Sequence, residues 1–556
     1  MSTPKIHRPW LNAYEPHVPH EIDLNAYKSI VDAFEQAFKK FEKNPSFHNM
    51  GRTISYGELD EYSAKFADYL QNVIGLKKGD RLAVMMPNIL QYPIAIFGAL
   101  RAGVIIVNIN PLYTPRELEH QLNDSGATAI VIFENACSTL EKVINNTKVK
   151  TVITTQIGDM LSFPKSILVN TVIKHVKKMV PPWSLPNSVA FLTALHSGQR
   201  DRLKSPVLNH DDTAFFQYTG GTTGVSKGAE LTHGNMIANL LQARSWIQSH
   251  LVEGKEIIIT PLPLYHIFSM TANCLVYSTV GALNVLITNP RDAKGFVKEL
   301  KKWRFTAMTG LNTLFNMLNN HPDFHTVDFS SLKLTLGGGM AVQKTVADAW
   351  KKITGCMIIE AYGLTETSPA ACINPFNIKD YTGYIGVPLS STDVVIRDDN
   401  NNDVKFGDVG EICIKGPQVM RGYFNKPEET EKVMTTDGFF KSGDLGFMTP
   451  EGFIKIVDRK KDMILVSGFN VYPNEIEDVV MRNPKVLECA AVAAPDQHSG
   501  EVVKIVIVKK DQSLTEAEVI DFCRKELTGY KVPKKVEFRK ELPKSNVGKV
   551  LRKDLR

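Results

Sequence analysis

A stretch rich in glycine and hydroxyl residues follows a strand-like segment, residues 212–218 (DTAFFQY). Its chemistry-bearing members are Thr219, Gly220, Gly221, Thr222, Thr223, Gly224 and Lys227. Glycines let backbone N–H groups turn toward phosphate oxygens, hydroxyls add hydrogen bonds or a metal ligand, and a lysine offsets negative charge. Gly228 stands where a Walker A loop requires Ser or Thr, and the spacing is not the GxGxxG of a dinucleotide site. We therefore predict a phosphate-binding loop of another kind, in preference to a flexible glycine–threonine hairpin.

The composition fits a soluble protein of several domains. The 556 residues are too many for one core, and 43% hydrophobic with 22% charged residues is ordinary for a globular chain. A formal charge of +6 is small for this length, so we expect no nucleic-acid partner. The seven cysteines are scattered without a CxxC pair and the start lacks a signal-peptide pattern, which together predict a cytoplasmic location. The longest apolar stretch, near residues 92–110, contains Arg101 and falls short of a membrane span.

The elements that must position such a loop follow an α/β pattern. From about residue 56 to residue 339, short β-branched runs alternate with segments of helical period, which predicts stacked βαβ units with mainly parallel strands. The candidate strands begin at Arg81, Ala129, Thr151, Glu256, Leu283 and Leu332. After about Pro388 the strand-like pieces become turn-rich, which indicates a smaller, more antiparallel subdomain.

The last part of the chain has the pattern of a compact α+β module. Strand-like runs precede a helix opened by a capping box, Thr515–Glu518, and another strand-like run follows it. The charged cluster at residues 458–462 lies between this module and the rest, and is either a linker or a solvated turn. We predict a first domain at residues 1–459 and a second at residues 460–556.

Seven segments resemble, in order, the motifs of the adenylate-forming enzymes, which include acyl-CoA synthetases, firefly-type luciferases and peptide-synthetase adenylation domains. They are residues 218–233, 261–268, 336–340, 362–366, 441–446, 458–477 and 543–552. Residues 458–477 and 108–127 are similar to bacterial long-chain fatty-acid–CoA ligases in particular. The resemblance covers nearly the whole chain.

The resemblance implies a fold and a two-step reaction. A medium- or long-chain fatty acid and ATP, with Mg²⁺, would give acyl-AMP and pyrophosphate, and coenzyme A would then displace AMP to form acyl-CoA. The large N-terminal domain of stacked, mainly parallel βαβ sheets would include a small β-barrel-like subdomain, and a small mobile α+β lid domain would follow. The glycine-rich loop would hold the β- and γ-phosphates. Family members are often monomers or homodimers.

The resemblance also assigns nucleotide-binding residues. Tyr362 would lie against the adenine ring, because an aromatic face stacks on a flat base; the alternative is a buried tyrosine at a strand end. Asp444 would accept hydrogen bonds from the ribose hydroxyls, and Arg459 would add a ribose or phosphate contact. The commoner TGD triplet is SGD here, and Ser442 keeps the hydroxyl. Glycines that would let the backbone approach the nucleotide are Gly338, Gly339 and Gly363.

Other residues would act at the reacting phosphate. By resemblance, Thr365 contacts the α-phosphate, and Glu366 with Thr219 holds Mg²⁺, which prefers hard oxygen ligands. The alternative for Glu366 is a carboxylate at a helix N-terminus. The lid would deliver Lys549 to stabilise the negative charge of the transition state for acyl-AMP formation. The alternative for Lys549 is a solvated lysine.

The remaining assignments concern the lid and the acyl site. Lys461 matches the hinge position of the family, where φ/ψ changes at one residue rotate the lid. Gly468 would line the channel for the pantetheine arm of coenzyme A, or be a simple turn residue. His266 and Phe268 would lie near the carboxylate end of the acyl site, with Asn312 along the acyl tunnel. A buried structural histidine explains His266 almost as well.

Residues 161–180 combine apolar residues with Lys174, Lys177 and Lys178 on the other side. This pattern predicts a basic amphipathic helix, which either packs on the core as an ordinary surface helix or makes peripheral contact with the inner membrane.

Two further functions stay open. The chain could be a ligase for another carboxylate, or one that delivers acyl-AMP to a carrier protein. In a different class, it could be a non-catalytic nucleotide- or acyl-binding relative. The presence of Glu366, Asp444, Arg459 and Lys549 argues against the second alternative.

Overall fold

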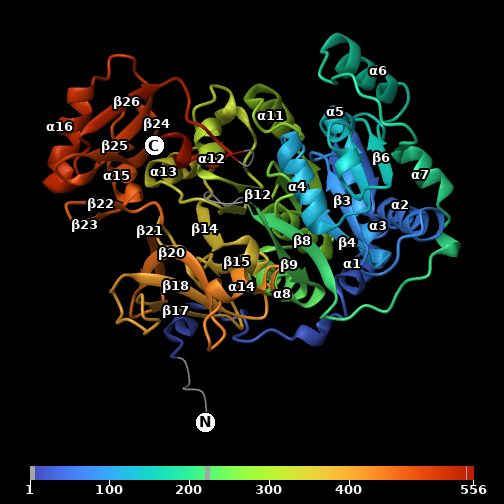
Figure 1. The fold of residues 1–556 in the computed structure, drawn as a ribbon, viewed down its shortest axis with the longest axis horizontal. Coiled ribbons are helices and arrows are strands. Elements are labelled where there is room, and N and C mark those ends of the chain that lie inside the picture. Colours follow the sequence, from blue (N-terminus) through green and yellow to red (C-terminus); the bar gives the residue numbers. More distant parts are fainter. Residues whose placement is uncertain (1–6, 220–225, 546–547) are drawn as a thin grey trace.

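A computed structural model describes residues 7–219, 226–545 and 548–556 (Figure 1). Its first large sheet has the order β19-β9-β8-β4-β3-β5-β6-β7. The strands β3 to β6 and β8 are parallel, whereas β8 and β9 form an antiparallel pair. The strand bounds are Arg81–Met85 (β3), Ile105–Asn108 (β4), Ala129–Phe133 (β5), Thr151–Thr155 (β6), Val189–Ala190 (β7), Thr213–Thr219 (β8), Lys227–Thr232 (β9) and Gly422–Tyr423 (β19).

The second large sheet has the order β16-β15-β14-β13-β12-β10-β11-β1-β2. Its central strands β10 to β14 and β1 are parallel, and most of their residues are buried, as expected of strands covered on both faces. The bounds are Pro45–Asn49 (β1), Arg52–Ser55 (β2), Ile257–Thr260 (β10), Leu283–Leu286 (β11), Ala307–Gly310 (β12), Leu334–Gly337 (β13), Ile358–Gly363 (β14), Ala370–Ile373 (β15) and Val387–Pro388 (β16). Each of the six strands expected near Arg81, Ala129, Thr151, Glu256, Leu283 and Leu332 is confirmed.

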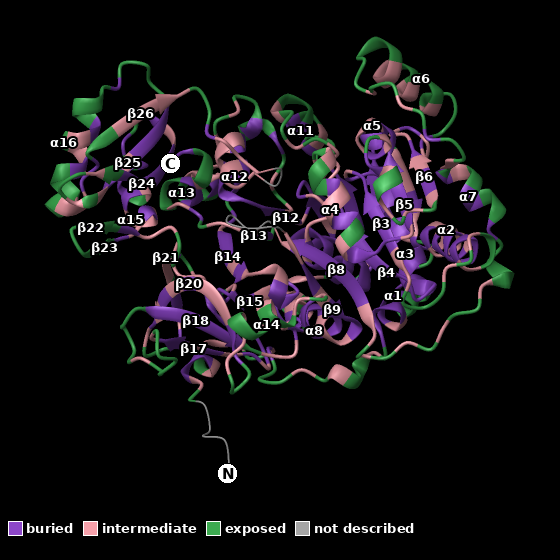
Figure 2. Cartoon of the chain, in the orientation of Figure 1, coloured by how far each residue is buried: buried purple, intermediate pink, exposed green. Residues whose placement is uncertain are grey.

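Two helices illustrate how the two sheets are packed. Every residue of α3 (Gln91–Arg101) is buried, so this helix has no solvent face. Its neighbour α2 (Tyr56–Asp68) starts at the capping box of Ser55 and Glu58. The purple interior of Figure 2 shows the resulting continuous buried core.

Two smaller, mainly antiparallel sheets follow in the chain. The subdomain sheet has the order β17-β18-β20-β21, with bounds Asp393–Arg397, Gly410–Lys415, Phe440–Met448 and Ile454–Arg459. The last sheet has the order β23-β22-β25-β24, with β26 parallel to β25 beside it. Its bounds are Ile464–Val466 (β22), Phe469–Val471 (β23), Val486–Asp496 (β24), Gly500–Lys509 (β25) and Lys535–Arg539 (β26). We call this sheet with α15 (Pro473–Val480) and α16 (Glu516–Glu526) the lid. The α/β fold class and the capping box of Thr515 before α16 are confirmed, whereas the boundary at 459/460 stays a prediction.

The helix expected over residues 161–180 is shorter. It runs as α6 (Lys165–Thr171) and continues as the π-helical turn η6 (Val172–Val176). Pro164 precedes the helix, and Lys178 has a φ of +51°, a left-handed conformation that helices do not continue through. No residue of α6 or η6 is buried, and Figure 2 shows the segment in green and pink at the edge of the molecule. Val169, Val172 and Ile173 are half-buried, so the surface helix and the membrane contact both stay predictions. Within the described ranges, no helix combines the length and apolarity needed to cross a bilayer.

Candidate functional site

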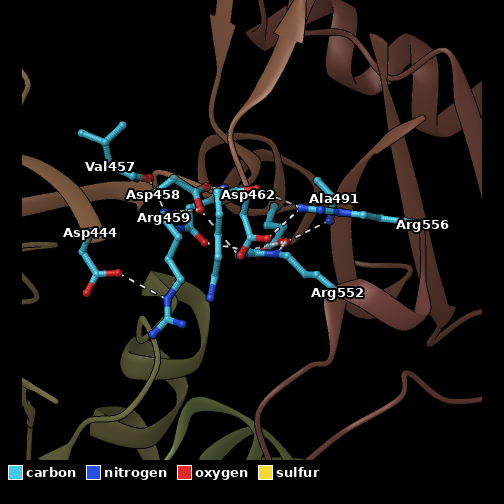
Figure 3. Close-up of polar contacts among 11 residues, drawn as sticks. Asp444, Val457, Asp458, Arg459, Asp462, Ala491, Arg552 and Arg556 are labelled. Carbon is cyan, nitrogen blue, oxygen red and sulfur yellow. Dashed lines mark hydrogen bonds and ion pairs between the residues drawn. The ribbon is translucent and has the colours of Figure 1, made fainter. Parts of the chain in front are cut away.

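Tyr362, near the end of β14, meets Asp444 in the middle of β20. The Tyr362 hydroxyl donates to Asp444 Oδ2 at 2.7 Å, and Arg459 Nε lies 3.3 Å from Asp444 Oδ1, as Figure 3 shows for the second pair. Asp444 and Arg459 are register partners on β20 and β21. Burial, with the nearby Asp444 carboxylate, raises the pKa of Tyr362 well above its usual value, so the hydroxyl remains a donor. Of the expected nucleotide residues, Asp444 therefore contacts both Tyr362 and Arg459.

Glu366 lies in the 3-10 turn η11 (Thr365–Thr367), which packs against β8 and β9. Its carboxylate is buried and accepts a hydrogen bond from the Tyr423 hydroxyl at 2.7 Å. Burial raises the pKa of Glu366, and this hydrogen bond opposes the rise. The nearby charges of Arg459 and Lys227 also oppose the rise, so positive groups surround this carboxylate, although none of the described residues forms an ion pair with it.

The expected magnesium ligands fit that ion in chemistry. Glu366 offers a carboxylate oxygen, and Thr219 offers a hydroxyl at the end of β8. Few protein oxygens combined with phosphate oxygens are the usual surroundings of Mg²⁺. No group of three or more acidic, histidine or cysteine side chains of the described residues is arranged as a metal site on its own.

Lys227 starts β9 beside the glycine-rich loop. Its ammonium lies 2.6 Å from Glu429 of α14 (Pro427–Val433) and 4.7 Å from the centroid of the Tyr423 ring. Tyr423 therefore connects Lys227 with Glu366, and sequence reasoning found neither Tyr423 nor Glu429. The expected phosphate-loop members Gly220, Gly221, Thr222, Thr223 and Gly224 lie outside the described residues.

Lys549 reaches the nucleotide residues from the lid. A Cβ built on Gly339, whose φ is +76°, would lie 3.5 Å from Lys549 Cε and 3.9 Å from its Nζ. The Thr313 hydroxyl of α12 (Asn312–Asn319) donates to the Gly548 carbonyl at 3.0 Å and ties the lysine loop to the body. Burial and the Arg459 charge lower the pKa of Lys549 to about 8, although Asp444 and Glu366 oppose this. Lys549 from the C-terminal part of the chain thus lies close to the nucleotide candidates of the N-terminal part.

The other glycines of the set are held by close packing. A Cβ on Gly363 would lie 1.8 Å from the Pro369 carbonyl oxygen, so no other residue fits there without movement of the backbone. A Cβ on Gly338 would approach the Phe268 ring at 3.2 Å. Gly338 and Phe268, expected at the nucleotide and acyl sites, are therefore neighbours.

The two remaining acyl-site candidates differ in their surroundings. The His266 Nδ1 accepts from the Phe268 N–H at 3.3 Å, and burial, followed by the Lys549 charge, lowers the pKa of His266 to about 3. His266 is therefore neutral and close to Lys549. The Asn312 Nδ2 donates to Gln343 Oε1 at 3.0 Å, and the Asn312 Oδ1 accepts from the Gln343 N–H at 2.9 Å. Both ends of the Asn312 amide are therefore hydrogen-bonded to Gln343. The acyl-site roles of all three residues stay predictions.

The hinge candidate Lys461 lies in a turn between β21 and β22. The N–H groups of Asp462 and Met463 donate to the Arg459 carbonyl at 2.9 and 3.2 Å. Gly468 forms the turn between β22 and β23 with a φ of +85° and open space around it. This geometry fits a turn residue, and its place beside the coenzyme A path remains a prediction.

Comparisons with known proteins agree with this arrangement. The family model for AMP-binding enzymes matches residues 34–424, and the model for the AMP-binding enzyme C-terminal domain matches residues 475–549. A long-chain-fatty-acid–CoA ligase of Escherichia coli O157:H7 is 57% identical over 547 residues, which are 98% of this chain and 97% of the relative. ATP-bound MatB from Rhodopseudomonas palustris has a TM-score of 0.82 at 26% identity, covering 95% of this chain and 98% of that one. The anthranilate CoA ligase AuaEII, in complex with anthranoyl-AMP, has a TM-score of 0.85 over 96% of this chain and 98% of its own, a likeness of fold alone at 23% identity. The chain is a member of the AMP-binding enzyme family.

Proposed function

We propose that the protein is an AMP-forming long-chain fatty-acid–CoA ligase. The observation that carries the proposal is Lys549 of the lid at Gly339, beside the Tyr362–Asp444 pair and the buried Glu366. A cation and a set of nucleotide-binding groups are what the attack of a carboxylate on an α-phosphate requires. The relative at 57% identity supports the long-chain fatty acid as the carboxylate.

The residues divide the work of the first step. Negative charge develops on the α-phosphate oxygens as the carboxylate attacks, and the Lys549 ammonium stabilises it from the lid side. Asp444 and Arg459 orient the ribose, while Tyr362 fixes Asp444 and offers its ring to the adenine. Glu366 and Thr219 would hold Mg²⁺, which supplies charge compensation for the phosphates when bound. In the second step, the coenzyme A thiolate attacks the acyl carbon and AMP leaves.

An acid panel tests the proposal. We expect ATP–pyrophosphate exchange to be fastest with medium- and long-chain fatty acids, and AMP release to require coenzyme A. Exchange only with short-chain or aromatic acids would favour the alternative ligase. Exchange without thioester formation would favour an acyl-AMP donor to a carrier protein. Nucleotide binding without any exchange would identify a non-catalytic relative.

The pKa of Lys549 predicts a pH dependence. In the free enzyme the amine is mostly protonated near pH 7 and loses its charge as the pH rises through about 8. We expect kcat/KM for ATP in pyrophosphate exchange to fall about tenfold per pH unit above that pH. The kcat should hold to higher pH, because a bound triphosphate favours the protonated amine. The Lys549→Arg variant, whose guanidinium stays charged, should lose this decline; an identical decline in that variant would contradict the assignment.

We also propose a cytoplasmic protein that docks on anionic membrane through α6 and its flanks. Large apolar side chains stand in solvent there, with exposed fractions of 81% for Phe163, 63% for Leu168 and 71% for Val176. Lys177 and Lys178 are exposed and form no ion pair with another described residue, so their charges are available to acidic headgroups. Lys174, grouped with them in the sequence, instead pairs with the buried Glu134 at 2.6 Å.

Vesicle co-sedimentation checks this docking. The Lys177→Gln/Lys178→Gln protein should bind vesicles that contain phosphatidylglycerol about 30-fold more weakly, since each basic residue near an anionic surface contributes about fivefold. Serine at Phe163, Leu168 and Val176 should abolish binding. The matched control replaces Val207 and Phe406, exposed apolar residues elsewhere, and should bind normally. Equal loss in the control, or no loss in the α6 variants, would reject this surface. Lys174 is left intact because reversing it would leave Glu134 unpaired.

A further inference from the structure

The start of the lid helix α15 is bound by a residue from the other side of the hinge turn. The Asn474 N–H in the first turn of α15 donates to Asp458 Oδ2 at 2.9 Å, and the Asn474 side chain donates to the Val457 carbonyl at 3.3 Å. The N-cap residue of α15, Tyr472, makes no side-chain cap bond. Asp458, the last but one residue of β21, therefore supplies the cap that the helix itself lacks.

Arg552 joins the same carboxylate from the lid. Its Nη1 lies 3.6 Å from Asp458 Oδ1, while its Nη2 donates to both oxygens of Glu477 on α15 at 2.8 and 2.9 Å (Figure 3). Glu477 also accepts from the Ala491 N–H of β24 at 2.8 Å. Asp458 is fully buried, and buried charges are held only where partners compensate them.

Arg552 lies in the C-terminal tail of the chain, residues 548–556, which also carries Lys549 three positions earlier. Arg556, further along this tail, donates to Asp462 Oδ1 at 2.8 Å and to the Lys461 carbonyl at 3.3 Å. The residue after Asp458 is Arg459, which contacts the ribose candidate Asp444. The tail, the hinge turn and the nucleotide residues are thus connected through short polar contacts.

We propose that Asp458 and Arg552 form a latch across the hinge that positions Lys549 for acyl-AMP formation. The latch rests on the proposed two-step function, because it requires a lid that takes another orientation for the thioester step. Rotation of the lid about Lys461 moves α15 and Arg552 relative to Asp458, so the contacts between them stabilise the present orientation alone. The Arg552–Glu477 pair lies within the lid and moves with it. Asp458 and Arg552 are positioning residues, since neither touches the reacting atoms.

Asp458→Asn is the primary test, because it removes the charge before the hinge and leaves Arg552–Glu477 intact. Acyl-AMP formation is measured without coenzyme A, and thioester formation is measured from supplied acyl-AMP. We expect the ratio of the second rate to the first to rise about tenfold, the scale of one charge-assisted hydrogen bond. Damage to the fold would lower both rates together and leave the ratio unchanged. Arg552→Lys keeps a positive charge but alters its contact with Asp458 and should give an intermediate ratio, so the latch is tested even if the asparagine variant is unstable.

Trypsin cleavage at Lys460 and Lys461 provides a readout that needs no fatty acid. Both residues are exposed in the hinge turn. Loss of the latch should raise the cleavage rate of the nucleotide-free protein about tenfold, since cleavage follows the population of the opened form. The control is Lys553→Gln, an exposed residue of the same tail that pairs with no other described side chain. An unchanged ratio with unchanged cleavage, or equal shifts in the control, would overturn the latch. Failure of the wild type to activate fatty acids would overturn the function instead, while cleavage would still decide on the latch.

Discussion

Replacing Lys549 by alanine is expected to lower acyl-AMP formation by roughly 100- to 1,000-fold, the loss typical of removing one preorganised transition-state donor. The Lys549 side chain is the lid group that packs at Gly339, within the electrostatic reach of Glu366, Asp444 and Arg459. Thioester formation from supplied acyl-AMP should be nearly unchanged, because in the proposed cycle the lid that carries Lys549 takes another orientation for that step. Single-turnover measurement of each half-reaction separates the two effects.

The controls for this result lie in the same tail. Lys549→Arg should retain part of the first step, since it keeps a positive charge with altered geometry. Lys553→Ala should retain all of it, because Lys553 is exposed. An equal loss of both half-reactions in Lys549→Ala would show a structural defect of the lid and would refute the catalytic assignment.

Proline at position 461 is expected to lower the thioester step by roughly 100-fold while acyl-AMP formation is retained. We propose Lys461 as the hinge, and a proline there fixes φ near −65° and removes the freedom that lid rotation needs. The Lys461 N–H donates to no other described residue, so the substitution breaks no hydrogen bond of the present orientation. The same two half-reaction assays measure the effect, with thermal unfolding as a check of the fold.

Lys461→Ala is the matched control, since it removes the same side chain but keeps the backbone free. It should carry out both steps at nearly the original rates. If the proline variant also retains both steps, rotation does not occur at this residue, and the hinge must be sought elsewhere in the turn that ends at Met463.

The parts of the fold that could be predicted are those with local causes. The parallel strands such as β5 and β10 are buried on both faces, so they are continuous β-branched runs that stand out in the sequence. The start of α16 depends on two residues three positions apart, Thr515 and Glu518. The helix at α6 is shorter than the sequence pattern predicts. Hydrophobic periodicity carries no sign of the left-handed backbone conformation at Lys178, where the helical segment has ended.

The contacts of the site are harder to predict because they join distant segments. Tyr423 lies 57 positions from its acceptor Glu366, and Glu429 lies 202 positions from Lys227. No local spacing pairs such residues, and a tyrosine after a glycine has no chemical pattern of its own. The contact between Asp458 and Arg552 is equally hard to predict, because both residues lie in segments with several other charged residues and nothing in the sequence distinguishes them. Motifs therefore locate the reacting groups, whereas the residues that aim them emerge only from the folded chain.

The position of α6 has a consequence for how the enzyme could work at a surface. Figure 1 shows α6 at one end of the molecule and the lid with α16 at the other. If the protein binds the membrane through α6, the rest of the N-terminal part lies between the bilayer and the lid. The large swing of that domain would then take place in bulk water, without lipid in its way and with free access for soluble coenzyme A. Anchoring and turnover would be mechanically independent, so a tighter grip on the membrane need not slow the catalytic cycle.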